Sequence, residues 1–386
     1  MRLLHTSDWH LGRSLHRADL SAGHEAFCEH LVEVVRSEQV DLVAVAGDVF
    51  DRAIPPLAAI ALFEDTLLRL RATGARVVVT SGNHDSAGRL GVNSRLLDDS
   101  GVHIRTRVEG LADPVIIEDT HGPVAVYAIP YLEPETVRGR LPGDEVLGTG
   151  HAAVLGQATA AARTDLATRG VPRSVAIAHG WVAGGELSDS ERDITVGGVG
   201  AVPAALFQGF SYTALGHLHR PQQVADALHY CGSPLPFSFS EAGQDKHSLL
   251  VTLDAAGLAS VEPVPAPVFR RLSVVRGLLA DVLRGHDDQA EHFVSVTLTD
   301  AVVPAGAMEH LRTRFPYVLR LGHEPATGDL STATYTSRVR GRSDLEITSG
   351  FVDHVRGVPA TESETALLTS ALEAGHRAEI DVEQVA

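Results

Sequence analysis

The chain begins Met1-Arg-Leu-Leu-His-Thr-Ser-Asp-Trp-His-Leu-Gly12. Residues 2–6 form a short run that contains two leucines and a β-branched threonine, as expected for a buried parallel strand. Asp8 and His10 follow this run directly, and carboxylate and imidazole groups are common metal ligands. In open α/β sheets, functional side chains lie just beyond the carboxyl ends of the strands. This stretch therefore predicts an α/β fold with a metal centre at one edge of a sheet.

Four later segments repeat the same arrangement of a strand-like run followed by polar residues. Asp48 follows 41–46, Asn83 and His84 follow 77–80, His179 follows 175–178, and His217 and His219 follow 212–215. With 20 histidines in the chain, any single one is more often an ordinary surface or core residue than a ligand. The conjunction of five such segments instead indicates two divalent ions about 3.5–4 Å apart, the site of a binuclear phosphoesterase.

These motifs resemble the calcineurin-like metallophosphoesterases, and most closely the SbcD family of nuclease subunits. The resemblance is carried by residues 1–12 and by three further stretches: Val45-Ala-Gly-Asp-Val-Phe-Asp51, Ala214-Leu-Gly-His-Leu-His-Arg220 and Tyr230-Cys-Gly-Ser-Pro234. It runs from Met1 to about Phe239 and continues weakly to the end of the chain. The opening motif is specific to the nuclease branch of the superfamily.

The resemblance implies a role for each residue of the site. One ion is held by Asp8, His10 and His219, the other by Asn83, His179 and His217, with Asp48 bridging them. His84 is implied to be a catalytic residue that orients the scissile phosphate and assists the transition state or the leaving oxygen. The bridged ions would supply hydroxide near neutral pH, and a mixed oxygen and nitrogen site favours Mn²⁺, with Mg²⁺ as the alternative. Asp51 stands where some archaeal relatives carry histidine.

The expected architecture is a four-layered α/β metallophosphoesterase sandwich, with two mixed sheets flanked by helices. We expect the nuclease domain over 1–268, a small α+β capping domain over 269–341 and a helical tail for partner docking over 342–386. Apolar periodicity predicts helices over 24–39 and 57–71, and a high alanine content predicts one over 152–168. The strands after residue 211 are expected to pair antiparallel. In the tail, residues 361–364 read as a capping box and Gly375 as a helix end.

Composition bounds the remaining possibilities. Cys28 and Cys231 form no disulfide framework, and no run reaches about 18 apolar residues, so we expect a cytoplasmic protein with no membrane span. The net charge of −17 argues against a broad DNA-binding surface. Four arginines lie close to the ligand segments in the sequence: Arg13, Arg52, Arg89 and Arg220. They would answer this objection if they form a basic rim at the site. They also fit ordinary surface positions.

Three functions remain open at this point. The favoured one is the nuclease subunit of an SbcCD-type complex, with double-strand exonuclease and single-strand or hairpin endonuclease activity in DNA repair, recombination and replication. Its partners would be DNA and an SbcC-type ATPase subunit, with a homodimer inside a heterotetramer. The second is a stand-alone metallophosphoesterase for small phosphodiesters. The third is a non-catalytic scaffold, which the intact ligand set disfavours.

Overall fold

The computed structural model describes residues 1–141, 148, 150–191, 200–325 and 342–383. The chain divides into two compact units, Met1–Ser273 and Val274–Ala386. The sequence also predicts a long polar and glycine-rich loop near the site over 183–202. Its residues Arg192 and Asp193, like the proposed boundary at residue 341, lie outside the described residues. Within the described residues, none of the helices has the length and apolar character of a membrane span.

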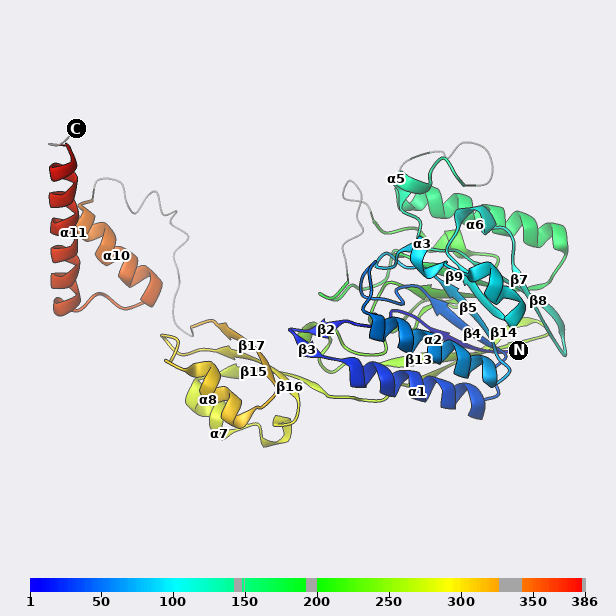
Figure 1. Cartoon of the computed structure of the whole chain (residues 1–386), viewed down its shortest axis with the longest axis horizontal. Helices are drawn as coiled ribbons and strands as arrows, with labels where there is room; N and C mark the ends of the chain where they lie inside the picture. The colour runs from blue at the N-terminus through cyan, green and yellow to red at the C-terminus, as the bar shows by residue number, and fades with distance from the viewer. Residues whose placement is uncertain (142–147, 149, 192–199, 326–341, 384–386) are drawn as a thin grey trace. The chain divides into compact units, whose positions relative to one another are not determined.

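Two six-stranded sheets form the first unit (Figure 1). The first sheet has the order β14-β13-β1-β4-β5-β6, and its four strands β1, β4, β5 and β6 run parallel. All five residues of β4 are buried, as expected for a strand covered on both faces. The strands of this sheet are β1 (Arg2–Thr6), β4 (Leu42–Ala46), β5 (Arg76–Thr80), β6 (Val102–Arg105), β13 (His247–Asp254) and β14 (Gly257–Pro265).

The second sheet has the order β11-β12-β10-β9-β8-β7. The antiparallel pairing predicted after residue 211 is correct for β13 and β14 but wrong for β10 and β12, which pair parallel. Apolar alternation does not encode strand direction, and the segment containing β11 carries the chain back without a helix. The strands are β7 (Val115–Asp119), β8 (Gly122–Ala128), β9 (Arg173–His179), β10 (Tyr212–Gly216), β11 (Gln222–Ala225) and β12 (Leu228–Tyr230).

Helices cover the outer faces of both sheets, which gives the four layers (Figure 1). α1 (Ser21–Ser37) and α2 (Leu57–Ala72) bury Phe27 and Leu70 against the first sheet, and α6 (His151–Arg169) buries Leu155 against the second. A third apolar layer, with Leu3 and Ile177, lies between the sheets. The α/β sandwich and its three long helices are therefore confirmed. Short elements complete the unit: β2 (Ser14–Leu15), β3 (Ala18–Asp19), α3 (Ala87–Leu90), α4 (Ser94–Leu97) and α5 (Pro134–Val137).

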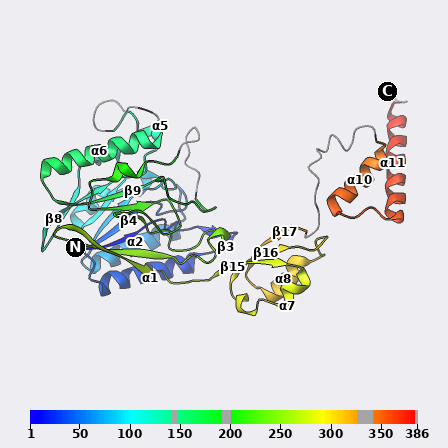
Figure 2. The same ribbon diagram turned by 180° about the vertical axis from the view of Figure 1, so that it is seen from behind.

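A three-stranded sheet, β15-β16-β17, follows, with α7 and α8 on one face (Figure 2). Its core includes Val294, Val296 and Leu311, all fully buried. Its elements are β15 (Leu272–Gly277), α7 (Leu279–Arg284), β16 (Phe293–Leu298), α8 (Ala307–Arg314) and β17 (Val318–His323).

Two helices, α10 (Asp344–Arg356) and α11 (Glu362–Glu383), form the tail. The predicted capping box is present, because Thr361 Oγ1 accepts from Glu364 N while the Glu364 carboxylate accepts from Thr361 N. A second box, between Ser343 and Glu346, opens α10. The predicted helix end at Gly375 is wrong, since α11 continues through it. A glycine ends a helix only where the chain turns left-handed, and inside a helix it costs about 1 kcal/mol.

Candidate metal centre

All eight residues predicted for the site gather at the carboxyl ends of β1, β4, β5, β9 and β10. Seven of them are buried, with exposed fractions between 0% for Asp8 and 9% for His84, and Asn83 is partly buried. Three neighbouring parallel strands of the first sheet and two of the second thus deliver the polar groups to one edge of the sandwich. The location predicted from the sequence is the location found.

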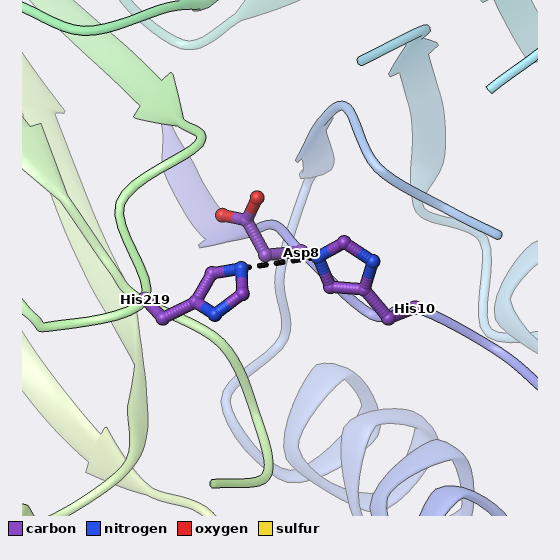
Figure 3. Close-up of side chains that lie close together, drawn as sticks. All are labelled: Asp8, His10 and His219. Carbon is purple, nitrogen blue, oxygen red and sulfur yellow. Dashed lines mark hydrogen bonds between the residues drawn. The ribbon is translucent and has the colours of Figure 1, made fainter. Parts of the chain in front are cut away.

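The first group consists of Asp8, His10 and His219 (Figure 3). Their ligand atoms all lie within 4.8 Å of one another. His10 Nε2 and His219 Nε2 face each other at 3.0 Å. Two ligand nitrogens that each lie about 2.0–2.2 Å from one ion are separated by about 3 Å, so this geometry fits a shared divalent cation.

The second group consists of Asn83, His179 and His217. Asn83 Oδ1 lies 2.9 Å from His179 Nε2 and 3.1 Å from His217 Nδ1. His179 Nδ1 lies 2.9 Å from the Ala46 carbonyl. A carbonyl only accepts, so Nδ1–H donates to it and Nε2 is the nitrogen that faces the site. Nε2 is therefore the nitrogen that would coordinate an ion.

Asp48 lies between the two groups. Its Oδ2 is 3.6 Å from His10 Nε2 and 3.5 Å from His179 Nε2. Its Oδ1 accepts a hydrogen bond from the backbone N–H of His84 at 2.8 Å. One carboxylate therefore faces a residue of each group, which is the position that a bridging ligand needs.

His84 lies beside the first group. Its ring centroid is 4.6 Å from that of His10, and its Nδ1 lies 2.7 Å from the Asp51 carbonyl. A possible ligand atom of His84 also lies within 4.8 Å of those of His10 and Asp48. Proximity alone therefore does not distinguish a ligand from a catalytic residue at this position.

Several site residues have backbone conformations that non-glycine residues rarely adopt. Asp8, His10, Asp48 and His217 have φ values of 53°, 45°, 50° and 106°. Each such residue costs of the order of 1 kcal/mol or more and persists only where its surroundings fix it. The backbone hydrogen bonds from Asp8 N to Gly47 O and from His10 N to Asp48 O, 3.1 and 3.0 Å, supply part of that constraint.

Two glycines let the strand ends approach each other. A Cβ atom on Gly216 would lie 1.9 Å from the Ala46 carbonyl oxygen, and one on Gly82 would lie 2.2 Å from Asp48 Oδ1. Neither position has room for a side chain. The close approach brings Asp48, Asn83 and His217 together.

Burial and the attraction between opposite charges together set the pKa values of the site residues. Burial alone would raise the pKa of Asp48, but the neighbouring His179 and His10 hold it well below its usual range. Burial also opposes the charged form of His179, but the Asp48 carboxylate raises the pKa of that imidazole to about 9. The pKa of His10 is lowered by burial. A carboxylate and an imidazolium thus compensate each other in the metal-free protein.

Sequence reasoning gave no role to several polar residues around the ligands. Asp85 accepts hydrogen bonds from the backbone N–H groups of Val49, Phe50 and Gly82, at 3.1, 2.9 and 2.9 Å. It directly follows His84, so its place in the motif was the available signal. The residues around His219 gave no local signal, because they come from distant parts of the chain: Ser190, Glu191, Glu241 and Lys246.

The predicted arginine rim does not include Arg13. Its side chain is only 16% exposed and lies 3.6 Å from Asp51, with its guanidinium 4.7 Å from the Phe237 ring centroid. Arg220 is exposed but paired with Glu186. Arg52 is exposed and its Nε lies 3.4 Å from Asp51 Oδ2, and Arg89 is exposed and donates to the Ala53 carbonyl. Three of the four arginines are therefore exposed, and each of these three has a polar partner.

A model of the calcineurin-like phosphoesterase family matches residues 1–123. The chain is 37% identical over 294 residues to the SbcD component of the SbcCD nuclease of Escherichia coli strain K12, covering 73% of this chain and 72% of that protein. The same values hold for the corresponding protein of Escherichia coli O157:H7.

Solved structures with low identity also match. One is GAP50, the anchor in the inner membrane complex of Plasmodium, with a TM-score of 0.43, 10% identity, and coverage of 85% of this chain and 98% of that one. Another is a dimetal phosphatase from Danio rerio, with a TM-score of 0.40, 14% identity, and coverage of 69% and 98%. The identity to the curated proteins, over nearly three quarters of both chains, decides the family. The chain belongs to the SbcD family of nuclease subunits within the calcineurin-like phosphoesterases, and it is a metal-dependent phosphodiesterase.

Proposed function

We propose that this protein is the nuclease subunit of an SbcCD-type complex and hydrolyses DNA phosphodiester bonds. Its substrates would be double-strand ends, attacked as an exonuclease, and single strands and hairpins, attacked as an endonuclease. The observation that carries the proposal is the convergence of Asp8, His10 and His219 in one group and Asn83, His179 and His217 in another, with Asp48 between them.

We assign the first group to one ion, the second group to the other, and Asp48 to both. The assignment is supported by the 3.0 Å contact between His10 Nε2 and His219 Nε2 and by the Nδ1–H tautomer of His179. Mn²⁺ suits this mixture of carboxylate, amide and imidazole groups, with Mg²⁺ as the alternative. When bound, such a pair polarises the phosphoryl oxygens and lowers the pKa of water.

The catalytic role falls to His84. Its Nδ1 carries a proton, because it faces the Asp51 carbonyl, which only accepts. A doubly protonated ring would then present Nε2–H to the scissile phosphate or to the leaving oxygen. Asp48 fixes the backbone of His84 through its Oδ1. The ring is thereby held beside the ligands while its second nitrogen serves the substrate.

The tail supports docking to an SbcC-type ATPase subunit. Phe351, Val355 and Leu367 are 51%, 67% and 71% exposed on α10 and α11. In the described residues, α10 buries none of its side chains. Short helices with an exposed apolar face gain stability by burying that face on another protein.

Self-association within the complex is supported by a second apolar surface, on the nuclease unit. Ile54, Leu57, Val92 and Leu96 are 69%, 84%, 59% and 78% exposed. The segments that carry them are tied together, because Arg89 donates to the Ala53 carbonyl. Exposed apolar residues gathered on neighbouring segments mark a protein interface more often than a free surface.

A single assay tests the proposal against its alternative. The purified protein is incubated with Mn²⁺ and either hairpin DNA or a chromogenic phosphodiester, with and without the ATPase subunit and ATP. We expect cleavage of both substrates, with ATP-dependent cleavage of DNA only when the ATPase is present, and none with Asp48→Ala. Hydrolysis of the small ester alone, whatever the additions, would establish a stand-alone phosphoesterase instead. Absence of all Mn²⁺-dependent cleavage would contradict both.

A further inference from the structure

His219 is held at three points by residues outside the two metal groups. Its backbone N–H donates to Glu191 Oε1 at 2.7 Å, and its carbonyl accepts from Lys246 Nζ at 2.8 Å. Its ring nitrogen Nδ1 lies 2.5 Å from Ser190 Oγ. These partners come from two segments far from His219 in the chain, 188–191 and 241–246. Among the polar residues that the structure describes around the site, these partners surround His219 on the side that faces away from His10.

The hydrogen bonds around Ser190 define which nitrogen of His219 carries the proton. Ser190 Oγ donates to Glu241 Oε1 at 2.6 Å, and a carboxylate only accepts. A hydroxyl has a single proton, so Ser190 Oγ must accept from His219 Nδ1–H. The lone pair of His219 therefore lies on Nε2, which faces His10 Nε2 at 3.0 Å.

The position of Glu241 is fixed and its negative charge is compensated by further contacts. Its second oxygen, Oε2, lies 2.5 Å from Lys246 Nζ, and both side chains are buried. Glu241 Oε1 also accepts from the backbone N–H of Phe237 at 3.3 Å. The serine, which is 8% exposed, thus connects a buried ion pair to the ring of a metal-site histidine. Such outer partners set the tautomer and orientation of a ligating imidazole.

The segment around Ser190 is anchored as firmly as the ligand. Arg13 donates to the Ser190 carbonyl at 2.9 Å, and Glu191 Oε2 accepts from both N–H and Oγ of Ser188 at 2.7 Å. Residues 188–191 therefore form a fixed turn rather than a loose loop end. The polar segment singled out in the sequence contacts the site through this turn.

We propose that Ser190 is a positioning residue of the metal centre: its hydroxyl fixes the ring and tautomer of His219 and thereby sets the affinity for the ion that His10 and His219 share. This inference rests on the proposed assignment of His219 as a metal ligand.

The test compares Ser190→Ala, Ser190→Thr and Ser211→Ala with the unchanged protein. Ser211 is a matched control, because its hydroxyl accepts from the Ser174 backbone N–H at the opposite end of β10. Mn²⁺ binding is measured by titration calorimetry without substrate. The tautomer of His219 is read by nitrogen-15 NMR of the metal-free protein, with its signal identified from the spectrum of His219→Ala.

We expect the unchanged protein to show the Nδ1–H tautomer for His219. Ser190→Ala should weaken one of the two Mn²⁺ sites about 10- to 100-fold and give a mixture of tautomers. Ser190→Thr, which keeps the hydroxyl, should recover most of the affinity, and Ser211→Ala should bind as the unchanged protein does.

Two results would overturn the inference. One is an Nε2–H tautomer of His219 in the unchanged protein, which needs no variant to be folded. The other is a folded Ser190→Ala protein that binds both ions with unchanged affinity. Failure of the unchanged protein to bind Mn²⁺ would instead contradict the proposed function, whereas the NMR result would still decide the tautomer.

Discussion

His84 and Asp48 are neighbours in the site but have different expected roles. His84→Ala should keep both metals and lower DNA cleavage about 10²- to 10⁴-fold, because the ring acts on the substrate. Asp48→Ala should lose or disorder metal, since one carboxylate faces both groups. Elemental analysis of the two purified variants, beside their cleavage rates, checks the difference. A His84→Ala protein that has lost metal would assign this residue to coordination instead.

Asp85 holds in place the backbone segments that carry Asp48 and His84. Its two oxygens accept three backbone hydrogen bonds, and an asparagine would present an NH₂ group to at least one of those N–H donors. Asp85→Asn should lower the free energy of unfolding by about 1–3 kcal/mol. Urea denaturation of the metal-free protein measures it, with Asp65→Asn on the exposed face of α2 as control. Equal unfolding midpoints would show that Asp85 has no bracing role.

Single residues also show what the sequence reveals and what it hides. The ligand candidates were predictable, because each follows a strand-like run and brings a metal-binding side chain. Ser190 and Glu241 were not, since serine and glutamate are common on surfaces and lie far along the chain from His219. Arg13 resembled a surface residue in the sequence but is packed against Phe237.

At the scale of elements, helices were easier to predict than strand directions. A stripe of apolar residues every three or four positions identified α1 and α2, alanine content identified α6, and the capping box at Thr361 located the start of α11. The parallel pairing of β10 with β12 was missed, because a buried strand is apolar whichever way its neighbours run. Gly375 was misread because helix geometry tolerates an exposed glycine.

The turn between α10 and α11 has a pH-dependent contact. Arg356 donates to both oxygens of Glu364, at 2.6 and 2.8 Å, and this pairing lowers the pKa of Glu364 from 4.5 to about 2. A lowered carboxyl pKa stabilises the folded hairpin above pH 4.5, and this contribution disappears as the pH falls through about 2. Carbon-13 NMR of the carboxyl group should show this titration, and Arg356→Gln should move it toward 4.5. An unmoved titration would remove Arg356 as the cause.

At the scale of the whole molecule, deleting the tail distinguishes a nuclease that depends on a partner from an enzyme that acts alone. Removing all residues after 341 should leave a folded protein that binds metal and hydrolyses small phosphodiesters. It should no longer co-purify with the ATPase subunit, because Phe351, Val355 and Leu367 are lost. Circular dichroism, metal analysis and co-purification check the three statements. An unfolded product would mean that the tail belongs to the core.

The overall charge of −17 makes local charge decisive for DNA binding. Replacing Arg52 and Arg89 together by glutamine should weaken DNA binding and reduce the magnitude of its salt slope by about 2, since each phosphate contact contributes close to 1. Binding measured across a range of salt concentrations checks this value, and hydrolysis of a small phosphodiester should persist. Arg220→Gln is the control, because Arg220 is paired more closely with Glu186 than Arg52 is with Asp51. An unchanged slope would assign both arginines to the ordinary surface.

The left-handed backbone at Asp8, His10, Asp48 and His217 has a consequence for how this protein evolves. Glycine would adopt the backbone conformation of each of these residues with less strain. Selection for stability and selection for catalysis therefore favour different residues at the same positions. A descendant that abandoned the chemistry would gain stability by replacing them. Only continued selection for cleavage keeps four strained side chains in place.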